Sequence, residues 1–502
     1  MLRRLGFLGS LLLGLLSAQA IAKDNKGPSV EYTTFDKPPL DHFYFEDSDV
    51  IILTIKDQGE GNTFRSDDAG VKWKPLKGVE KGQTWEVQRH PYIQGIAVVI
   101  GLKKTHWITK DSGETWLEFK TEEEATMGPY KIGFHATDPD RMIFHAAECG
   151  SFLCSTKDYY TIDGFRNGAK ILHPDAINCM WAKTVDQFTT GDADLDKNRI
   201  MCNVRGKWDV FQTSSRLLVS DDFFKTEGVE PALQGDRPVP GIVNLAAVKG
   251  YFVAAAKSEG SAEMAMYVTD NTEKWHRAEF GTEHKLEESA FTLLEGTNYS
   301  MQVDVMTTTP LMPAMGVLYT SNSNGTFFTK NLEHTNRNTY GLVDFEKIQN
   351  IQGIVMANVV DNWEEVEANG MAIKDIKTQI SFDDGRTWQP PQADGKDLHL
   401  HSVTDQRNEG RIYSSPAPGI IMGVGNTGKF LKPREECDLY VSDDAGLTWT
   451  RALKNPHLFE TGDQGALLVA IEDGETDEIR WSLNHGKDWS TFELKHKITP
   501  SP

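Results

Sequence analysis

Acidic side chains recur in one eight-residue pattern, and they are the first candidates for chemistry. The pattern places a carboxylate at its third position in Asp68, Asp111, Asp383 and Asp444. Two carboxylates that flank a glycosidic bond can hydrolyse it. In this pattern, however, the Asp lies just ahead of a Gly, where its side chain can accept hydrogen bonds from backbone N–H groups and close a turn. We therefore predict that these carboxylates are structural, that there is no catalytic residue, and that the chain is not an enzyme.

A second acidic group, Asp192, Asp194 and Asp196, has the alternating spacing that opens the calcium loop of an EF-hand. Lys197 stands where that loop requires Gly, and Asn203 stands where it requires Glu. Because both positions depart from the pattern, we interpret this segment as a solvated loop.

Two further patterns could hold a metal or a cofactor. His399 and His401 would share one face of a strand, as metal ligands could, but no third ligand is near in the sequence. Residues 423–428 have the glycine spacing of a dinucleotide-binding loop. Pro433 follows closely and no helical pattern begins there, so a flexible loop between strands is predicted. We expect no metal and no cofactor.

The turns that hold the acidic residues belong to a repeat. Clear copies lie at 109–116, 381–388 and 442–449, and near copies lie at 66–73 and 482–489. Weaker copies begin at 161, 220, 269 and 321, which gives nine units at steps of roughly 40 to 60 residues. Gly supplies the positive φ of the turn, and Thr and Trp then re-enter a strand. The pattern predicts a β-hairpin turn with a buried Trp.

Repeats of this length that carry several short strands are typical of β-propeller blades. Apolar runs at 353–360 and 466–471 have the composition of inner strands, and long helical periodicity is absent from the sequence. The predicted fold class is therefore all-β, a β-propeller.

The N-terminus has the features of a secretory signal peptide. Arg3 and Arg4 precede an apolar run at 5–16, and small residues lead to a cleavage site near Ala22. Residues 1–22 are predicted to be the signal peptide and 23–502 the mature domain. The apolar run at 241–256 is interrupted by Lys249, which favours one or two buried strands over a membrane span. We expect the chain in the lumen of the secretory pathway.

Cysteine content agrees with an oxidising compartment. The five cysteines are Cys149, Cys154, Cys179, Cys202 and Cys437. The first two are close enough to join the arms of a hairpin, the next two could close a longer loop, and the last is left over. A zinc site is the alternative, but no Cys-x-x-Cys or His spacing supports it. Sequons at Asn298 and Asn324 are candidate glycosylation sites.

The overall charge limits the partners. Asp and Glu number 73 against 52 Lys and Arg, which gives a formal net charge of −21. Nucleic acid and anionic membrane are excluded as main partners, because binding of phosphate needs a cationic face.

Longer stretches carry a resemblance to a known family. They are residues 148–154 and 159–165, then 331–338, 343–348, 351–354, 397–402 and 440–446. Together with the eight-residue pattern, which matches the Asp-box, they resemble the Vps10/sortilin family from about residue 43 to 492, most closely its fungal members.

The resemblance implies a ten-bladed propeller whose wide central tunnel binds peptide or protein cargo. The receptor would carry soluble vacuolar hydrolase precursors from the trans-Golgi network to the endosome, the prevacuolar compartment and the vacuole. Residues 23–502 would be its lumenal cargo-binding domain, with the tenth blade incomplete because nine boxes are found. The membrane would be reached only through a span that this sequence does not contain.

The resemblance also suggests a ligand contact, because in sortilins an arginine of the sixth blade region is implicated in binding a ligand's C-terminal carboxylate. The corresponding stretch is 331–338, where His334 falls near the expected place and Arg337 is the only arginine. We therefore predict ligand binding by Arg337 with His334. The alternatives are a secreted Asp-box glycoside hydrolase of sialidase or xyloglucanase type, and a purely structural scaffold.

Overall fold

The structure is a computed structural model that describes residues 16–19, 29–46, 48–128, 130–149, 154–206, 215–257, 264–281, 291–297, 299–308, 312–338, 340–405 and 413–500. Within these ranges the helices are short: α1 (Ala193–Asn198), α2 (Trp363–Ala368) and the 3-10 turns η2 (Arg434–Glu436) and η3 (Asp463–Gly465). Nearly all other regular structure is β-strand, which confirms the predicted all-β class.

The strands form consecutive antiparallel sheets. Up to residue 277 they are β1 (Leu16–Gln19) and β2 (Ser29–Tyr32); β3 (Pro39–Tyr44), β4 (Ile51–Asp57), β5 (Glu60–Ser66) and β6 (Lys74–Pro75); β7 (Thr84–Arg89), β8 (Ala97–Gly101), β9 (Thr105–Thr109) and β10 (Leu117–Lys120); β11 (Glu124–Ala125), β12 (Ile132–Phe134), β13 (Met142–Cys149), β14 (Cys154–Thr161) and β15 (Lys170–Ile171); β16 (Ala176–Trp181), β17 (Ile200–Val204) and β18 (Arg216–Ser220); β19 (Ile242–Val248), β20 (Tyr251–Lys257), β21 (Met264–Thr269) and β22 (His276–Arg277).

The remaining strands form three more sheets, the first of which has seven strands. They are β23 (Phe291–Gly296), β24 (Met301–Met306), β25 (Met315–Ser321), β26 (Phe328–Asn336), β27 (Phe345–Lys347), β28 (Val355–Val360) and β29 (Ile376–Ser381); β30 (Gln392–Ala393), β31 (Lys396–Leu400), β32 (Tyr413–Ser414), β33 (Ile421–Thr427), β34 (Asp438–Ser442) and β35 (Thr450–Leu453); β36 (His457–Gly462), β37 (Leu467–Glu472), β38 (Thr476–Ser482) and β39 (Ser490–Ile498).

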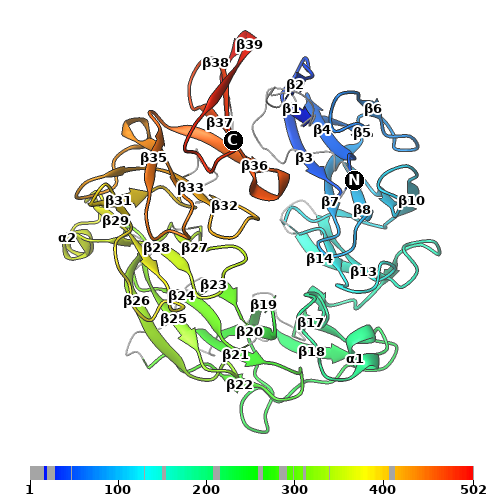
Figure 1. Ribbon diagram of the computed structural model, residues 1–502. Coiled ribbons are helices and arrows are strands. Elements are labelled where there is room, and N and C mark those ends of the chain that lie inside the picture. The colour runs from blue at the N-terminus through cyan, green and yellow to red at the C-terminus, as the bar shows by residue number, and fades with distance from the viewer. Residues whose placement is uncertain are drawn as a thin grey trace.

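The sheets follow one another around a ring, with the first strand of most sheets near the centre and the last strand outside (Figure 1). The sheet β36–β39 lies beside β3–β6, so the two ends of the ring adjoin. Burial raises the pKa of Tyr44 in β3, and the charge of Glu460 in β36 adds to this effect across the junction. This arrangement confirms the predicted β-propeller. The number of blades and the limits of the domain stay predictions.

Apolar side chains of neighbouring sheets pack together and form the core between them. Val98 and Ile108 of one sheet meet Phe144 and Tyr159 of the next. Each sheet therefore buries its faces against its neighbours, as expected for repeated sheets that have little core of their own.

The segment at 241–256 forms two strands, β19 and β20, and Lys249 lies in the turn between them. The predicted buried strands are confirmed. No helix among the described residues is long and apolar enough to cross a membrane. Most of the predicted signal peptide lies outside the described residues; its residues 16–19 form β1, which pairs with β2.

Candidate functional site

The Asp-box turns are closed by hydrogen bonds within each box. At 381–388, Ser381 Oγ accepts from Gly385 N at 2.8 Å and donates to Asp383 Oδ1 at 2.8 Å. Thr387 donates to Asp383 twice, from its N–H at 2.8 Å and its hydroxyl at 2.7 Å. Trp388 Nε1 donates to Gly385 O at 2.9 Å. The polar groups of the turn thus satisfy one another.

A backbone N–H of the seventh box residue also donates to the other carboxylates that were considered for catalysis, Asp68, Asp111 and Asp444. At Asp111 and Asp444 a Thr hydroxyl donates as well. Backbone and side-chain hydrogen bonds from Thr387 lower the pKa of Asp383 to about 2, so its carboxylate stays ionised at neutral pH and is a poor proton donor. The four turns lie in four different sheets. A glycosidase needs two carboxyl groups on either side of one bond, and this arrangement does not supply such a pair from the boxes.

The burial of the box Trp differs from the prediction. Trp449 is buried, with 2% of its surface exposed, but Trp73, Trp116, Trp388 and Trp489 are only half-buried. Each of these four indoles lies at the end of its turn, where Nε1 donates to the carbonyl oxygen of the box glycine.

Arg337, a predicted ligand contact, lies in the interior of its sheet. Its Nη1 is 2.6 Å from Asp304 Oδ1, and its Nη2 donates to Thr292 Oγ1 at 3.1 Å. Only 2% of Arg337 is exposed and Asp304 is fully buried. Burial raises the pKa of Asp304, whereas Arg337 and a hydrogen bond from Thr335 oppose that rise. The Arg337 guanidinium does bind a carboxylate, but this carboxylate is that of Asp304 in the same chain.

His334 lies on β26, three residues before Arg337, which follows the end of that strand. Its backbone is left-handed, with φ of 57°, and its ring stacks on Trp363 of α2 at 4.2 Å between centroids. Burial lowers the pKa of His334. The structure places this ring against an outer helix and the Arg337 guanidinium against β23 and β24. Ligand binding by either residue stays a prediction.

The cysteines pair within the sheets. Cys149 and Cys154 face each other on β13 and β14, and Cys179 and Cys202 face each other on β16 and β17; both pairs form disulfides. Cys437 is buried and has no disulfide partner among the described residues. Burial raises the pKa of Cys437 to about 12, so its thiol is un-ionised.

The acidic residues at 192–196 were predicted to lie in a loop. This prediction is wrong, because they form the N-terminal end of α1. Asp192 caps this helix, with Oδ1 accepting from Asp194 N at 2.8 Å and Leu195 N at 3.1 Å. Asp196 accepts from Thr190 N at 2.6 Å. The described residues contain no cluster of three or more metal-ligating side chains.

The glycine-rich run at 423–428 was predicted to be a flexible loop, and this is wrong. Residues 421–427 form β33, which pairs with β31 and β34. A Cβ on Gly425 would lie 1.9 Å from His399 O, so glycine is needed there for close strand approach. His399 Nδ1 accepts from Thr378 N, and His401 lies 3.1 Å from Asp405 Oδ2. These two histidines therefore have separate structural partners.

One sequon can be placed. Asn324 lies in an Asp-box turn, is partly exposed, and accepts from Thr326 N through Oδ1 at 3.2 Å. Asn298 lies outside the described residues.

A cavity of about 820 Å³ lies where several sheets meet, and sequence reasoning did not predict it. Its lining comes from the turn after β19, the end of β23 and the turn that follows, and β27 with the loop after it. Figure 1 places β19 and β23 next to the centre of the ring. The residues that line the cavity are Gln187, Lys249, Leu294, Glu295, Thr297, Tyr299 and residues 345–352.

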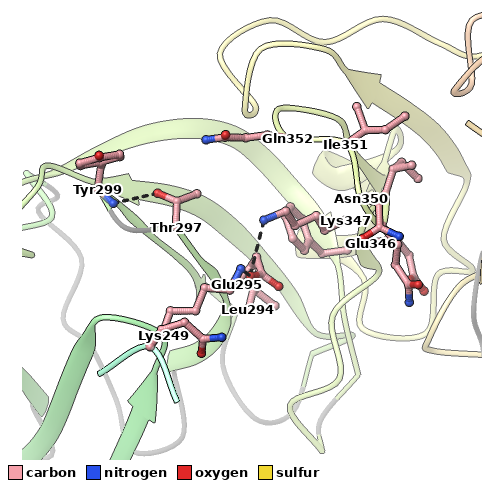
Figure 2. A pocket seen from close by; sticks show the side chains of 14 residues that line it. Lys249, Leu294, Glu295, Thr297, Tyr299, Glu346, Lys347, Asn350, Ile351 and Gln352 are labelled. Atoms are coloured by element: carbon pink, nitrogen blue, oxygen red, sulfur yellow. Dashed lines mark hydrogen bonds and ion pairs between the residues drawn. The ribbon is translucent and has the colours of Figure 1, made fainter. Parts of the chain in front are cut away.

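Charged groups meet inside this cavity. Glu295 Oε1 is 2.5 Å from Lys249 Nζ and 3.6 Å from Lys347 Nζ (Figure 2). The three side chains come from the turn between β19 and β20, from β23 and from β27, so the cavity depends on the assembled fold. Lining residues 345–348, 351 and 352 fall in the stretches 343–348 and 351–354, whose family resemblance was the one sequence signal for this region.

The chain is similar to fungal proteins over nearly its whole length. It is 48% identical over 98% of its residues to "Vacuolar protein sorting/targeting protein 10" of Pyricularia oryzae and 50% identical over 98% to the protein of that name from Pyrenophora tritici-repentis. It spans about a third of these relatives, 33% and 32% of their lengths.

Solved structures are more distant. A GH74 xyloglucanase from Xanthomonas campestris is 13% identical, with a TM-score of 0.31 over 88% of this chain and 64% of that chain. A eukaryotic initiation factor is 11% identical, with a TM-score of 0.47 over 90% of this chain and 98% of that chain. Likenesses at this level carry no argument about function.

A family model decides the membership. The model described as Sortilin, neurotensin receptor 3 matches residues 61–501, which is most of the chain. This chain belongs to the Sortilin-Vps10 family.

Proposed function

We propose that this chain is the lumenal cargo-binding part of a sorting receptor for soluble vacuolar hydrolase precursors, acting between the trans-Golgi network, the endosome and the vacuole. The observation that carries the proposal is the match over 98% of the chain to fungal relatives named for vacuolar protein sorting and targeting. Residues 1–22 act as the signal peptide and 23–502 as the mature domain in this account. Glycans on Asn298 and Asn324 are part of the same proposal.

The cavity beside β23 and β27 is the proposed place of cargo contact. Its volume of about 820 Å³ is within the size range of ligand sites, roughly 300–1,000 Å³. Its lining combines apolar side chains, such as Leu294 and Ile351, with amides, such as Gln349 and Asn350. This mixture suits a peptide segment, which offers both side chains and backbone groups.

Binding without catalysis is proposed because the box carboxylates are consumed by their turns. The glycoside hydrolase alternative is not favoured, because the Sortilin-Vps10 family model matches residues 61–501 and the boxes supply no pair of carboxyl groups around one bond. Arg337 contributes by holding Thr292, which precedes the cavity residues of β23. Direct ligand contact by Arg337 would require its guanidinium to leave Asp304.

Calorimetric titration of the purified chain with a vacuolar hydrolase precursor tests the proposal. We expect saturable binding and no release of sugar from xyloglucan or sialosides in a parallel assay. A chain that is folded by circular dichroism and binds no precursor would contradict the proposal, as would sugar release.

A further inference from the structure

The thiol of Cys437 lies among several electron-pair donors. Cys437 comes directly before β34, and only 1% of its surface is exposed. Its Sγ lies 3.4 Å from Pro433 O, 3.6 Å from Lys432 O, 3.6 Å from His401 Nε2 and 3.7 Å from Asn426 Oδ1. A thiol carries one hydrogen and can donate it to only one of these atoms. The surroundings of the sulfur therefore offer more electron pairs than the thiol can use.

The ring of His401 directs a further electron pair at the same space. Its Nδ1 lies 3.1 Å from Asp405 Oδ2, and a nitrogen that faces a carboxylate at this distance must carry hydrogen. In a neutral imidazole the other nitrogen, Nε2, is then an acceptor. Nε2, however, lies 3.0 Å from Lys432 O, which is also an acceptor. Two acceptors this close need a cation between them, either a proton on the ring or a metal ion.

The distances fit a zinc ion. Zinc binds a cysteine sulfur at about 2.3 Å and a histidine nitrogen at about 2.0–2.1 Å, and its bonds are arranged tetrahedrally, which places the two atoms about 3.5 Å apart. The observed distance between Cys437 Sγ and His401 Nε2 is 3.6 Å. With Lys432 O they surround a point that is roughly 2 Å from each, close to the length of a zinc bond. Pro433 O or Asn426 Oδ1, both beside the sulfur, can supply a fourth ligand.

The groups around the histidine hold it in place for such a role. A histidine that binds a metal usually donates its other N–H to a carboxylate, which is the position of Asp405. Asp405 Oδ2 lies 3.6 Å from Arg434 Nη1, and Arg434 Nε lies 2.8 Å from Asp473 Oδ2. The side chain of His401 is 12% exposed, so the ring leaves a path from solvent.

The donors come from three neighbouring parts of one sheet. His401 follows β31, Asn426 belongs to β33, which pairs with β31, and the other donors lie between β33 and β34 (Figure 1). A metal ion at this point would fasten the segment 428–437 to the sheet. Cys437 and His401 are 36 residues apart, so the spacing in the sequence predicted no metal here.

We propose that Cys437 Sγ, His401 Nε2 and Lys432 O form a structural zinc site, in which Asp405 orients the histidine. Zn²⁺ forms bonds to Sγ and Nε2 and displaces the thiol proton, together with any proton on Nε2, into solvent. This inference does not depend on the proposed function, because the site lies apart from the cavity and needs no cargo.

Metal titration of the purified chain, first freed of metal with a chelator, tests the site. Co²⁺ serves as the spectroscopic probe, and we expect one ion per chain with a thiolate-to-metal charge-transfer absorption that Zn²⁺ abolishes by displacement. Cys437→Ser should lose this absorption. Asp405→Asn should retain it but bind about 10–100-fold more weakly, as expected for a positioning residue. His496→Gln, an exposed histidine of β39, is the matched control and should bind as the wild type does.

Thermal unfolding gives a second readout. Zinc at one hundred times its Kd should raise the melting temperature of the wild type by about 3 °C and leave that of Cys437→Ser unchanged. Melting of each variant without metal shows whether it is folded. A wild type with neither the absorption nor the shift would overturn the inference, since a proton would then join the two acceptors. Equal zinc binding by the wild type, Cys437→Ser and His401→Gln would also overturn it.

Discussion

The outer Asp-box turns and the inner cavity both contain carboxylates, but they use them differently. In the turns each carboxylate has several donors within its own eight residues, as Asp383 has from Ser381 and Thr387. In the cavity Glu295 of β23 is shared by Lys249, from the turn between β19 and β20, and by Lys347 of β27. A carboxylate that is saturated within its own turn stabilises that turn, whereas a shared one joins separate parts of the ring. The contrast separates scaffold from site.

The largest loss of stability is expected at the ion pair of Asp304 and Arg337, which is buried in the interior. Asp304→Ala would leave the Arg337 guanidinium charged in the interior. Breaking a buried pair in this way costs about 3–5 kcal/mol of unfolding free energy. Urea unfolding measures the loss. A double variant, Asp304→Leu with Arg337→Met, should recover much of the lost unfolding free energy. An Asp304→Ala chain that is as stable as the wild type would contradict the structural role of this pair.

The pH dependence of stability tests a buried histidine whose ring nitrogens are already hydrogen-bonded. His90 Nδ1 accepts from Tyr92 N and Ile93 N, and Nε2 is 3.0 Å from His135 O, so the neutral ring is satisfied. Burial lowers the pKa of His90 from 6.5 to about 4. The unfolded chain therefore binds more protons in this window, and stability should fall as pH drops from about 6.5 to 4.

The expected loss is on the order of 2–3 kcal/mol. Unfolding titrations at several pH values should show a shallower dependence in His90→Gln than in the wild type. An identical dependence would mean that other groups cause the loss.

Removing the hydrogen bonds of a single Asp-box turn should cost less unfolding free energy than breaking the buried ion pair. Ser381→Ala removes the acceptor of Gly385 N and Asp383 N, and about 1–2 kcal/mol of unfolding free energy should be lost. Binding of the hydrolase precursor should not change. Arg386→Ala, an exposed position of the same turn, is the control and should leave stability unchanged. Weaker precursor binding by Ser381→Ala would break the distinction between the turns and the cavity.

The smallest effect concerns backbone strain in a turn. Ala445 has φ of 65°, a region that glycine occupies without strain. Ala445→Gly should therefore raise the melting temperature, by the equivalent of about 0.5–1 kcal/mol. Ala466→Gly, where φ is −74°, should lower it. Equal changes at both positions would contradict the strain argument.

The sequence was informative where the structure is local. The Asp-box turns are closed within eight residues, and the two disulfides join adjacent strands, so spacing alone predicted them. Two predictions were wrong, a buried Trp in each box and a flexible loop at 423–428. Burial of the Trp side chains and the close strand approach at Gly425 both depend on neighbouring strands. The cavity was missed because Lys249, Glu295 and Lys347 meet only when the ring is assembled.

Hydrogen–deuterium exchange of the chain, with and without a vacuolar hydrolase precursor, tests the division into scaffold and site most directly. The account predicts protection on binding in peptides that contain Lys249, Glu295 and residues 345–352, with no change in the outer turns at 381–388 and 442–449. Protection confined to those outer turns, with none around the cavity, would contradict it.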